Sequence, residues 1–164
     1  RSADGIARGQ PLSVGVAAIA IAVLVAAALR SPKLGAIAMI PNVIPVLVFF
    51  GVLGLGAAPL SLPTSLVGCM ALGVAIDDTV HLLARYRAER RAGGGRAEAL
   101  DATVRWVGRP VVITSVMLCL GFLVITGSRF ASLQAFGVLS ALTMGVCLAT
   151  DLILLPAVLA RTER

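Results

Sequence analysis

The sequence has little charge. Of its 164 residues only 13% are Asp, Glu, Lys or Arg, whereas 59% are hydrophobic. A soluble domain of this size needs more polar surface than these residues supply, so a water-soluble globular fold is excluded. The composition therefore predicts an integral membrane protein.

Cysteine is also scarce, and no motif of catalysis or metal binding is present. The three cysteines, Cys69, Cys119 and Cys147, lie in apolar segments with a spacing that fits no metal motif. Their odd number provides no disulfide framework, which favours a role as small packing residues. The sequence also lacks a Walker-type phosphate loop and any nucleophile–base spacing. We therefore expect no enzymatic activity, no cofactor and no bound metal.

Long apolar runs are what the sequence does contain. About twenty apolar residues cross a bilayer as a helix, and we mark five such runs: residues 12–29, 34–57, 62–83, 110–126 and 133–160. The predicted fold class is an all-α integral membrane protein, with five transmembrane helices in one domain over residues 12–164. Residues 1–11 are too short and too polar to form a domain of their own.

The cations are distributed unevenly among the loops. All Lys and Arg residues except Arg1, Arg8 and Arg129 lie between the first and second runs, between the third and fourth, or after the fifth. Cytoplasmic loops of membrane proteins carry the excess of Lys and Arg, so we expect the N-terminus outside and the C-terminus in the cytoplasm. The net charge of +6 then reflects topology, and binding to nucleic acid is disfavoured.

Residues 85–109 are expected to form a cytoplasmic connector. The segment breaks at the glycines 93–95, and from Arg96 to Val107 apolar residues recur at helical spacing. Trp106 is typical of an anchor at the membrane interface. We predict an amphipathic helix lying on the inner membrane face, followed by a turn at Gly108. A solvated connector is favoured over a regulatory or partner-binding element.

The second run contains Pro41 and Pro45 on either side of Asn42. Each proline removes a backbone hydrogen bond and crowds the preceding turn, so this helix should kink or locally unwind. A break of this kind either lines a cavity or serves helix packing alone, and both interpretations stay open.

The third run carries ionisable residues at membrane depth. Asp77 and Asp78 are adjacent, and His81, the single histidine, follows one turn later. At about 100° per residue, Gly73, Asp77, His81 and Arg85 form one row along the helix. Ionisable groups are costly inside a bilayer, so this row is expected to serve an ion or proton pathway.

Polar residues of other runs fall at a similar depth. At about 1.5 Å per residue from the nearest cytoplasmic cation, Asn42 lies about 13 Å deep, the two acids about 10–12 Å, Thr114 and Ser115 about 8–9 Å, and Asp151 about 15 Å. In a helix bundle such groups can satisfy one another, and we expect Asp78 to face Thr114 or Asp151. No buried Lys or Arg neutralises the acids, so they should bind protons, as a proton relay requires.

The acidic stretch and several shorter motifs resemble one superfamily. The stretch reads Gly73-Val-Ala-Ile-Asp77-Asp78-Thr-Val-His81-Leu-Leu-Ala-Arg85-Tyr-Arg87. It resembles the acidic helix of the resistance-nodulation-division (RND) superfamily, most closely its MMPL-type and hopanoid-transporter-like exporters. The resemblance extends over nearly the whole chain through P-N-V-I-P at 41–45, G-R-P-V-V-I-T-S at 108–115, G-F at 121–122 and L-L-P at 154–156.

This resemblance implies an exporter of lipid-like or hydrophobic compounds in a bacterial inner (plasma) membrane, driven by the proton-motive force. The chain is similar to the last five helices of one half-transporter, so residues 1–11 would be the end of an exported domain. The positions of Asp77 and Asp78 match the acidic pair that takes part in proton coupling, whereas the match of Asp151 is weaker.

Further residues are expected to support this relay. His81, Thr114, Asp151 and Asn42 would lie around it, and Gly73 would permit close helix packing beside it. The implied partners are membrane lipids, protons and the other half of the transporter, with a homo-oligomer expected. Two alternatives stay open: a lipid-sensing membrane module similar to sterol-sensing domains, and an inactive fragment of a transporter.

Overall fold

The computed structural model describes residues 2–56 and 61–162, and every regular element in these two ranges is helical. In chain order the helices are α1 (Ser2–Ala28), α2 (Pro32–Gly54), α3 (Leu62–Arg91), α4 (Arg96–Thr103), α5 (Arg109–Ile125), α6 (Ala131–Ala149) and α7 (Leu155–Thr162). Two π-helical turns, η1 (Val104–Gly108) and η2 (Thr150–Leu154), join α4 to α5 and α6 to α7. The predicted all-α class is confirmed.

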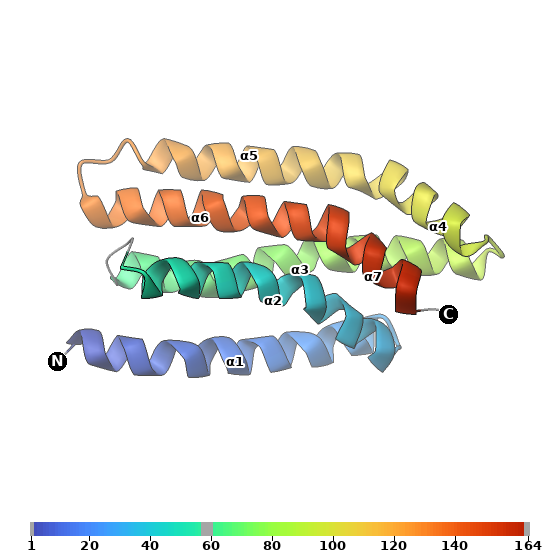
Figure 1. The fold of residues 1–164 in the computed structure, drawn as a ribbon, viewed down its shortest axis with the longest axis horizontal. Helices are drawn as coiled ribbons and strands as arrows, with labels where there is room; N and C mark the ends of the chain where they lie inside the picture. The colour runs from blue at the N-terminus through green and yellow to red at the C-terminus, as the bar shows by residue number, and fades with distance from the viewer. Residues whose placement is uncertain (1, 57–60, 163–164) are drawn as a thin grey trace.

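The helices form one elongated bundle (Figure 1). Helices α2, α3 and α6 pack against one another, α5 packs on α6, and α1 contacts α2 and α3. Four stretches are long and apolar enough to cross a membrane: Pro32–Gly54, Pro63–Arg91, Arg96–Ile125 and Ala131–Arg161. Within the described residues the apolar part of α1, Gly15–Ala28, is shorter. The predicted membrane protein is thus confirmed, whereas its fifth span and its orientation stay predictions.

The connector between the third and fourth runs differs from its prediction. Helix α3 continues to Arg91, the chain turns at the glycines 93–95, and α4 packs back against α3 (Figure 1). The predicted turn at Gly108 is wrong, because Gly108 has helical backbone angles (φ −60°, ψ −41°) and residues 96–125 are continuously helical. Ala99 is buried in one apolar cluster with the C-terminal half of α3. The apolar side of α4 therefore covers α3.

Both π-helical turns end two residues before a proline, η1 before Pro110 and η2 before Pro156. A proline lacks the N–H that would bond the carbonyl four residues earlier, and its ring crowds that carbonyl. A single wider turn relieves the crowding without ending the helix. The continuity of α4 with α5, and of α6 with α7, follows from this local adjustment.

Helix α2 accommodates its two internal prolines in another way. It is helical from Pro32 to Gly54 without a break, so the alternative of local unwinding is wrong. Figure 1 shows its first turns inclined to the remainder of the helix, as a kink requires. Pro41 and Pro45 are both buried, together with Asn42 between them. The side of α2 that carries the prolines therefore faces the other helices.

Candidate functional site

Three consecutive polar side chains of α3 have different surroundings. Asp77 is exposed, Asp78 is half-buried and Thr79 is completely buried. Consecutive residues of an α-helix point about 100° apart, so a single turn can supply three directions. One turn of α3 thereby contributes to an exposed Asp–His pair, a cavity and a buried hydrogen-bond network.

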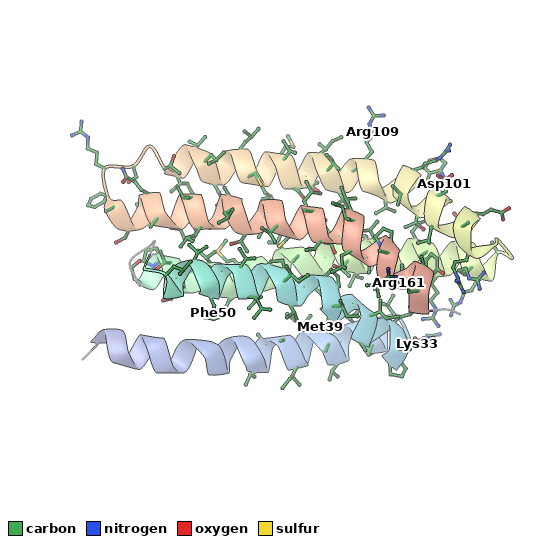
Figure 2. The ribbon with its side chains drawn as sticks, in the orientation of Figure 1. Lys33, Met39, Phe50, Asp101, Arg109 and Arg161 are labelled. Carbon is green, nitrogen blue, oxygen red and sulfur yellow. The ribbon has the colours of Figure 1, made fainter. Side chains whose placement is uncertain are left out.

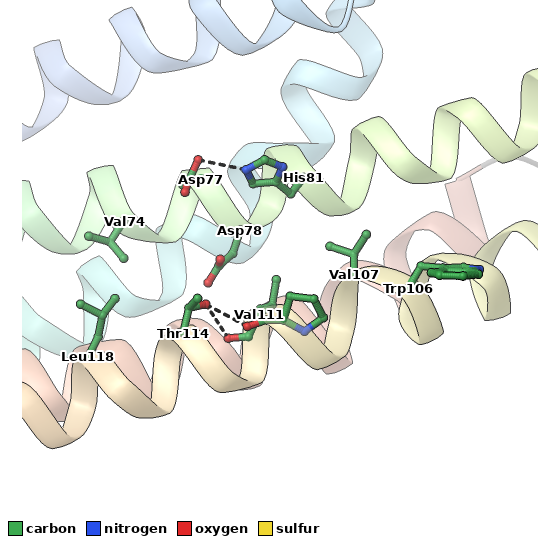
Figure 3. A pocket seen from close by; sticks show the side chains of 10 residues that line it. Val74, Asp77, Asp78, His81, Trp106, Val107, Val111, Thr114 and Leu118 are labelled. Atoms are coloured by element: carbon green, nitrogen blue, oxygen red, sulfur yellow. Dashed lines mark hydrogen bonds and ion pairs between the residues drawn. The ribbon is translucent and has the colours of Figure 1, made fainter.

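A cavity of about 410 Å³ lies between α3 and α5 (Figure 3). Asp78 points into it from α3, and the hydroxyl of Ser115 on α5 donates a hydrogen bond to Asp78 Oδ2 over 3.2 Å. The other lining residues are Val74, Asp77, His81, Trp106, Val107, Pro110, Val111, Thr114 and Leu118. The Asp78 carboxyl is therefore held by a hydroxyl in largely apolar surroundings.

Asp77 and His81 form the exposed part of the site. His81 Nε2 lies 3.6 Å from Asp77 Oδ1, and the two side chains are 67% and 74% exposed respectively. They stand one turn apart on the same face of α3, as the i, i+4 spacing predicts. Two exposed polar side chains thus stand beside the cavity that they help to line, on a helix long enough to span a membrane.

Asp151 belongs to a separate, buried network. The Thr79 hydroxyl donates a hydrogen bond to Asp151 Oδ1 over 2.6 Å, and it accepts one from Asn42 Nδ2 over 3.0 Å. The Asn42 amide also donates to the Ala38 carbonyl over 2.6 Å. Residues of α2, α3 and η2 are thereby joined at the centre of the bundle.

Two oxygen atoms of this network have no hydrogen-bond partner among the described residues: Asn42 Oδ1 and Asp151 Oδ2. Buried polar atoms are normally hydrogen-bonded, and an unpartnered one requires an explanation. A proton on the Asp151 carboxyl would give it a donor as well as an acceptor. The network is thus able to hold a proton.

Among the described residues, the nearby arginines form salt bridges with acids other than Asp77, Asp78 and Asp151. Arg85 of α3 pairs with Glu89, and Arg105 of η1 pairs with Asp101 over 2.9 Å. In the described part of the chain no group of three or more His, Cys, Asp or Glu side chains is placed to hold a metal ion. Carboxyl, hydroxyl, amide and imidazole groups are therefore the chemistry that the site offers.

The structure brings some of the predicted residues together and separates others. Asp78 hydrogen-bonds Ser115 in place of the expected Thr114 or Asp151. The Thr114 hydroxyl lines the cavity but donates within its own helix, with the carbonyls of Pro110 and Val111 at 3.1 and 3.0 Å.

Gly73 is exposed, and no described atom lies within 4 Å of the position that a Cβ would take. Within the described part of this chain it makes no close helix contact, so the packing expected of it is not present there. A helix that presents Gly73 outward presents Asp77 outward as well, because the two share one row of α3.

Sequence reasoning missed Thr79, which links Asn42 to Asp151. A threonine in an apolar helix usually bonds its own backbone, and Thr79 Oγ1 does lie 3.1 Å from the Ala75 carbonyl. Its position next to Asp78 was the available signal. When Asp78 faces one neighbouring helix, the next side chain is turned toward another.

These observations define a class: an integral membrane protein of bundled apolar helices whose interior carries carboxyl groups. The chain belongs to the MMPL family, whose family model matches residues 2–164. The resemblance to MMPL-type proteins is thereby confirmed.

Three relatives illustrate the similarity. The protein MJ1562 of Methanocaldococcus jannaschii, named as a membrane protein, is 30% identical over 155 residues, which cover 94% of this chain and 40% of that protein. MmpL11 of Mycobacterium tuberculosis, named as a heme uptake protein, and MmpL11 of Mycobacterium bovis, named as a transport protein, are each 30% identical over 101 residues. Those matches cover 62% of this chain and 10% of each relative. The chain thus spans less than half of the length of the relatives it matches, and no solved structure matches it.

Proposed function

We propose that the chain forms the membrane portion of an RND-type exporter of lipid-like or hydrophobic substrates, driven by the proton-motive force. The observation that carries this proposal is the pairing of Asp78 and Asp151 with hydroxyl groups, those of Ser115 and Thr79, inside a bundle of apolar helices long enough to cross a membrane. Among the described residues, no Lys or Arg forms a salt bridge with either acid. A carboxyl in a low dielectric changes its protonation more readily than it keeps an isolated charge. Groups of this kind are what a proton relay in a membrane needs.

In this proposal Asp77 and Asp78 carry the protons. The exposed pair of Asp77 and His81 takes up a proton at the face of α3, and Asp78 holds it in the cavity. The backbone links Asp78 directly to Thr79, and through Thr79 to the buried Asp151. A change of charge at Asp78 can therefore alter the packing between α3 and η2. Asn42 and Thr114 support this arrangement from α2 and α5.

The proposed protein crosses the inner (plasma) membrane five times, with the N-terminus outside and the C-terminus in the cytoplasm. The exposed Asp77 and His81 side chains support an assembly with another half-transporter or a second copy of this chain. Polar groups that face lipid are costly, and a partner bundle would remove them from it. Lipids and protons are further proposed partners, and nucleic acid is not among them.

A transport assay tests the proposal. Cells that express the complete transporter are loaded with a fluorescent hydrophobic dye, and dye efflux is measured with and without a protonophore. We expect efflux above that of cells without the transporter, and its loss when the protonophore collapses the gradient. Efflux that persists unchanged after the gradient is abolished would contradict proton coupling.

The second candidate is a lipid-sensing membrane module, which the largely apolar cavity between α3 and α5 favours. A sensor would bind lipid without moving it against a gradient. Saturable binding of a hydrophobic probe without any protonophore-sensitive efflux would support the sensor. Absence of both activities in an expressed, membrane-inserted protein would support an inactive fragment.

A further inference from the structure

A second pocket lies at one end of the bundle, between the α1–α2 turn and the C-terminal part of α3. Its volume is about 330 Å³, and its lining contains Arg30, Arg87 and Arg91. The remaining lining residues are Leu29 and three alanines, so no acidic side chain lines the pocket. Three guanidinium-bearing residues therefore surround one cavity without a carboxylate among them.

The arginines on α3 are placed there by helix geometry. Arg87 and Arg91 are four residues apart and so share one face, and Ala84 and Ala88, also in the lining, leave room beside them. Arg85, which lies off this face, forms a salt bridge with Glu89. Among the described residues neither Arg87 nor Arg91 forms a salt bridge.

Arg30 reaches the pocket from an unusual backbone position. Helix α1 ends with hydrogen bonds from Arg30 N to the Ala27 carbonyl and from Ser31 N to the Ala26 carbonyl, the pattern of a Schellman turn. The residue at the position of Arg30 takes a positive φ, here 45°, and is usually glycine. Arg30 therefore places a cationic side chain at a backbone position that favours glycine.

The neighbouring residues fix this turn. Ser31 accepts a hydrogen bond from Leu34 N and so caps α2, and Leu29 is buried. A Cβ on Gly35 would lie 2.7 Å from Ala26 Cβ, so α1 and α2 approach closely just beside the turn. The direction in which Arg30 leaves the backbone is therefore set by the packing of α1 on α2.

We propose that this pocket binds the phosphate of an anionic membrane phospholipid. The planar guanidinium group donates paired hydrogen bonds that match phosphate oxygens. The pocket lies where α3 passes from its apolar run to its charged end. A membrane-spanning α3 would hold this end at the level of the lipid headgroups. A general excess of cytoplasmic cations explains the number of arginines but not their convergence on one pocket. The proposal rests on the membrane location and not on transport activity.

The experiment measures thermal unfolding of the protein purified from membranes in dodecyl maltoside. Phosphatidylglycerol, phosphatidylcholine and inorganic phosphate are added in parallel at matched concentrations. A ligand that binds the folded state raises the unfolding midpoint, so we expect phosphatidylglycerol to raise it more than either of the others. An equal rise with phosphatidylcholine would overturn the headgroup assignment. A rise in the midpoint with inorganic phosphate as large as that with phosphatidylglycerol would show that free phosphate, and not a lipid, is the ligand.

Variants locate the site. Replacing both Arg87→Gln and Arg91→Gln should weaken phosphatidylglycerol binding by about tenfold or more, because each charge-assisted hydrogen bond contributes on that scale. Arg109→Gln combined with Arg129→Gln is the matched control, because it removes the same charge and both arginines are exposed and lie outside the pocket. Figure 2 shows Arg109 on α5. Equal loss in the control would show that overall charge, and not this pocket, attracts the lipid.

Arg30→Gly separates lipid binding from folding. Glycine suits the positive φ of this position, so the variant should unfold without lipid at the same midpoint or a higher one. Its rise in midpoint with phosphatidylglycerol should nevertheless be smaller than that of the unaltered protein. A full rise in this variant, together with a full rise in the Arg87 and Arg91 variant, would overturn the proposal.

Discussion

At the scale of the residue, the site is built from short polar side chains whose neighbours differ sharply over one helical turn. Asp77 is open to its surroundings, Asp78 has Ser115 as partner and Thr79 has Asp151. A substitution at each of these positions therefore tests a different interaction. Conservative changes are the informative ones, because they alter a proton or a hydroxyl and leave the side-chain volume nearly constant.

The first such test concerns Asp77 and Asp78. Asn retains the size and the hydrogen-bond acceptor of Asp but does not titrate, and Ser115 can still donate to it. We expect Asp77→Asn and Asp78→Asn each to abolish protonophore-sensitive efflux by the complete transporter while its abundance in the membrane stays near normal. His81→Gln should reduce efflux less.

Asp101→Asn is the control for these variants, because Asp101 is an exposed acid of α4 outside the cavity. It should leave efflux unchanged. If either the Asp77 or the Asp78 variant kept full proton-dependent efflux, that residue would not belong to the relay.

Thr79 provides a test of stability. Thr79→Val keeps the shape of the side chain but removes the hydroxyl that donates to Asp151 and accepts from Asn42. Leaving buried polar partners unsatisfied costs about 1–3 kcal/mol, so the free energy of unfolding in detergent should fall by that amount. Thr79→Ser should recover most of the loss.

Thr114→Val is the matched control, because the Thr114 hydroxyl bonds only its own helix and its side chain is exposed. We expect a change within about 0.5 kcal/mol. Equal destabilisation by the two valine variants would show that the network of Thr79 has no special contribution.

At the scale of the element, α5 and α6 pack closely against each other. A Cβ on Gly137 would lie 2.6 Å from the Phe122 carbonyl oxygen, and the ring of Phe122 meets Phe136 edge-on with centroids 5.9 Å apart. The absence of a side chain at Gly137 thus allows the two helices to approach, and the aromatic pair packs beside the contact. The contact holds α5, which carries Ser115, against α6, which continues into the η2 turn that carries Asp151.

Gly137→Ala should therefore separate α5 from α6. Overpacking a close contact typically costs about 1–3 kcal/mol, which we expect as a loss in the free energy of unfolding. Gly145→Ala, in the same helix, has no atom within 4 Å of its new Cβ and should be tolerated. The two variants are compared by unfolding in mixed detergent. Equal free energies of unfolding would contradict this expectation.

At the scale of the whole molecule, the two ends of the bundle differ in charge. The turn at Gly94 lies at one end together with the α1–α2 turn, and the loop at Ser128 lies at the other (Figure 1). Lys33 and Arg161, labelled in Figure 2, mark the end rich in cations. The excess of cations predicts that this end is cytoplasmic.

Cysteine labelling checks this orientation. In a variant without the native cysteines, a single cysteine at Ser128 should react with an impermeant reagent added outside, and one at Gly94 should react only after the membrane is opened. The distribution of cations also predicts that Pro59 lies outside. Pro59 falls outside the described residues, and a single cysteine there can be tested in the same way. Reaction of the Gly94 position from outside would reverse the topology.

The sequence by itself determined the all-helical class, and it predicted the approximate depth of the polar groups. Apolar runs interrupted by charged loops are a local signal, and the rise per residue converts position along a helix into depth. The row of Gly73, Asp77 and His81 is likewise a property of one helix. These features needed no knowledge of how the helices pack. The same is true of the family resemblance, which rests on motifs within single segments.

Only the tertiary structure decided which polar groups meet. Depth does not fix the rotation of a helix about its own axis, and that rotation selected Ser115 over Thr114 as the partner of Asp78. It also turned Thr79 toward Asp151 and left Gly73 without a close neighbour among the described residues. Rotation is set by the interlocking of side chains from several helices, together with the π-helical turns that absorb prolines. This information is distributed over segments far apart in the chain, so no single stretch of sequence displays it.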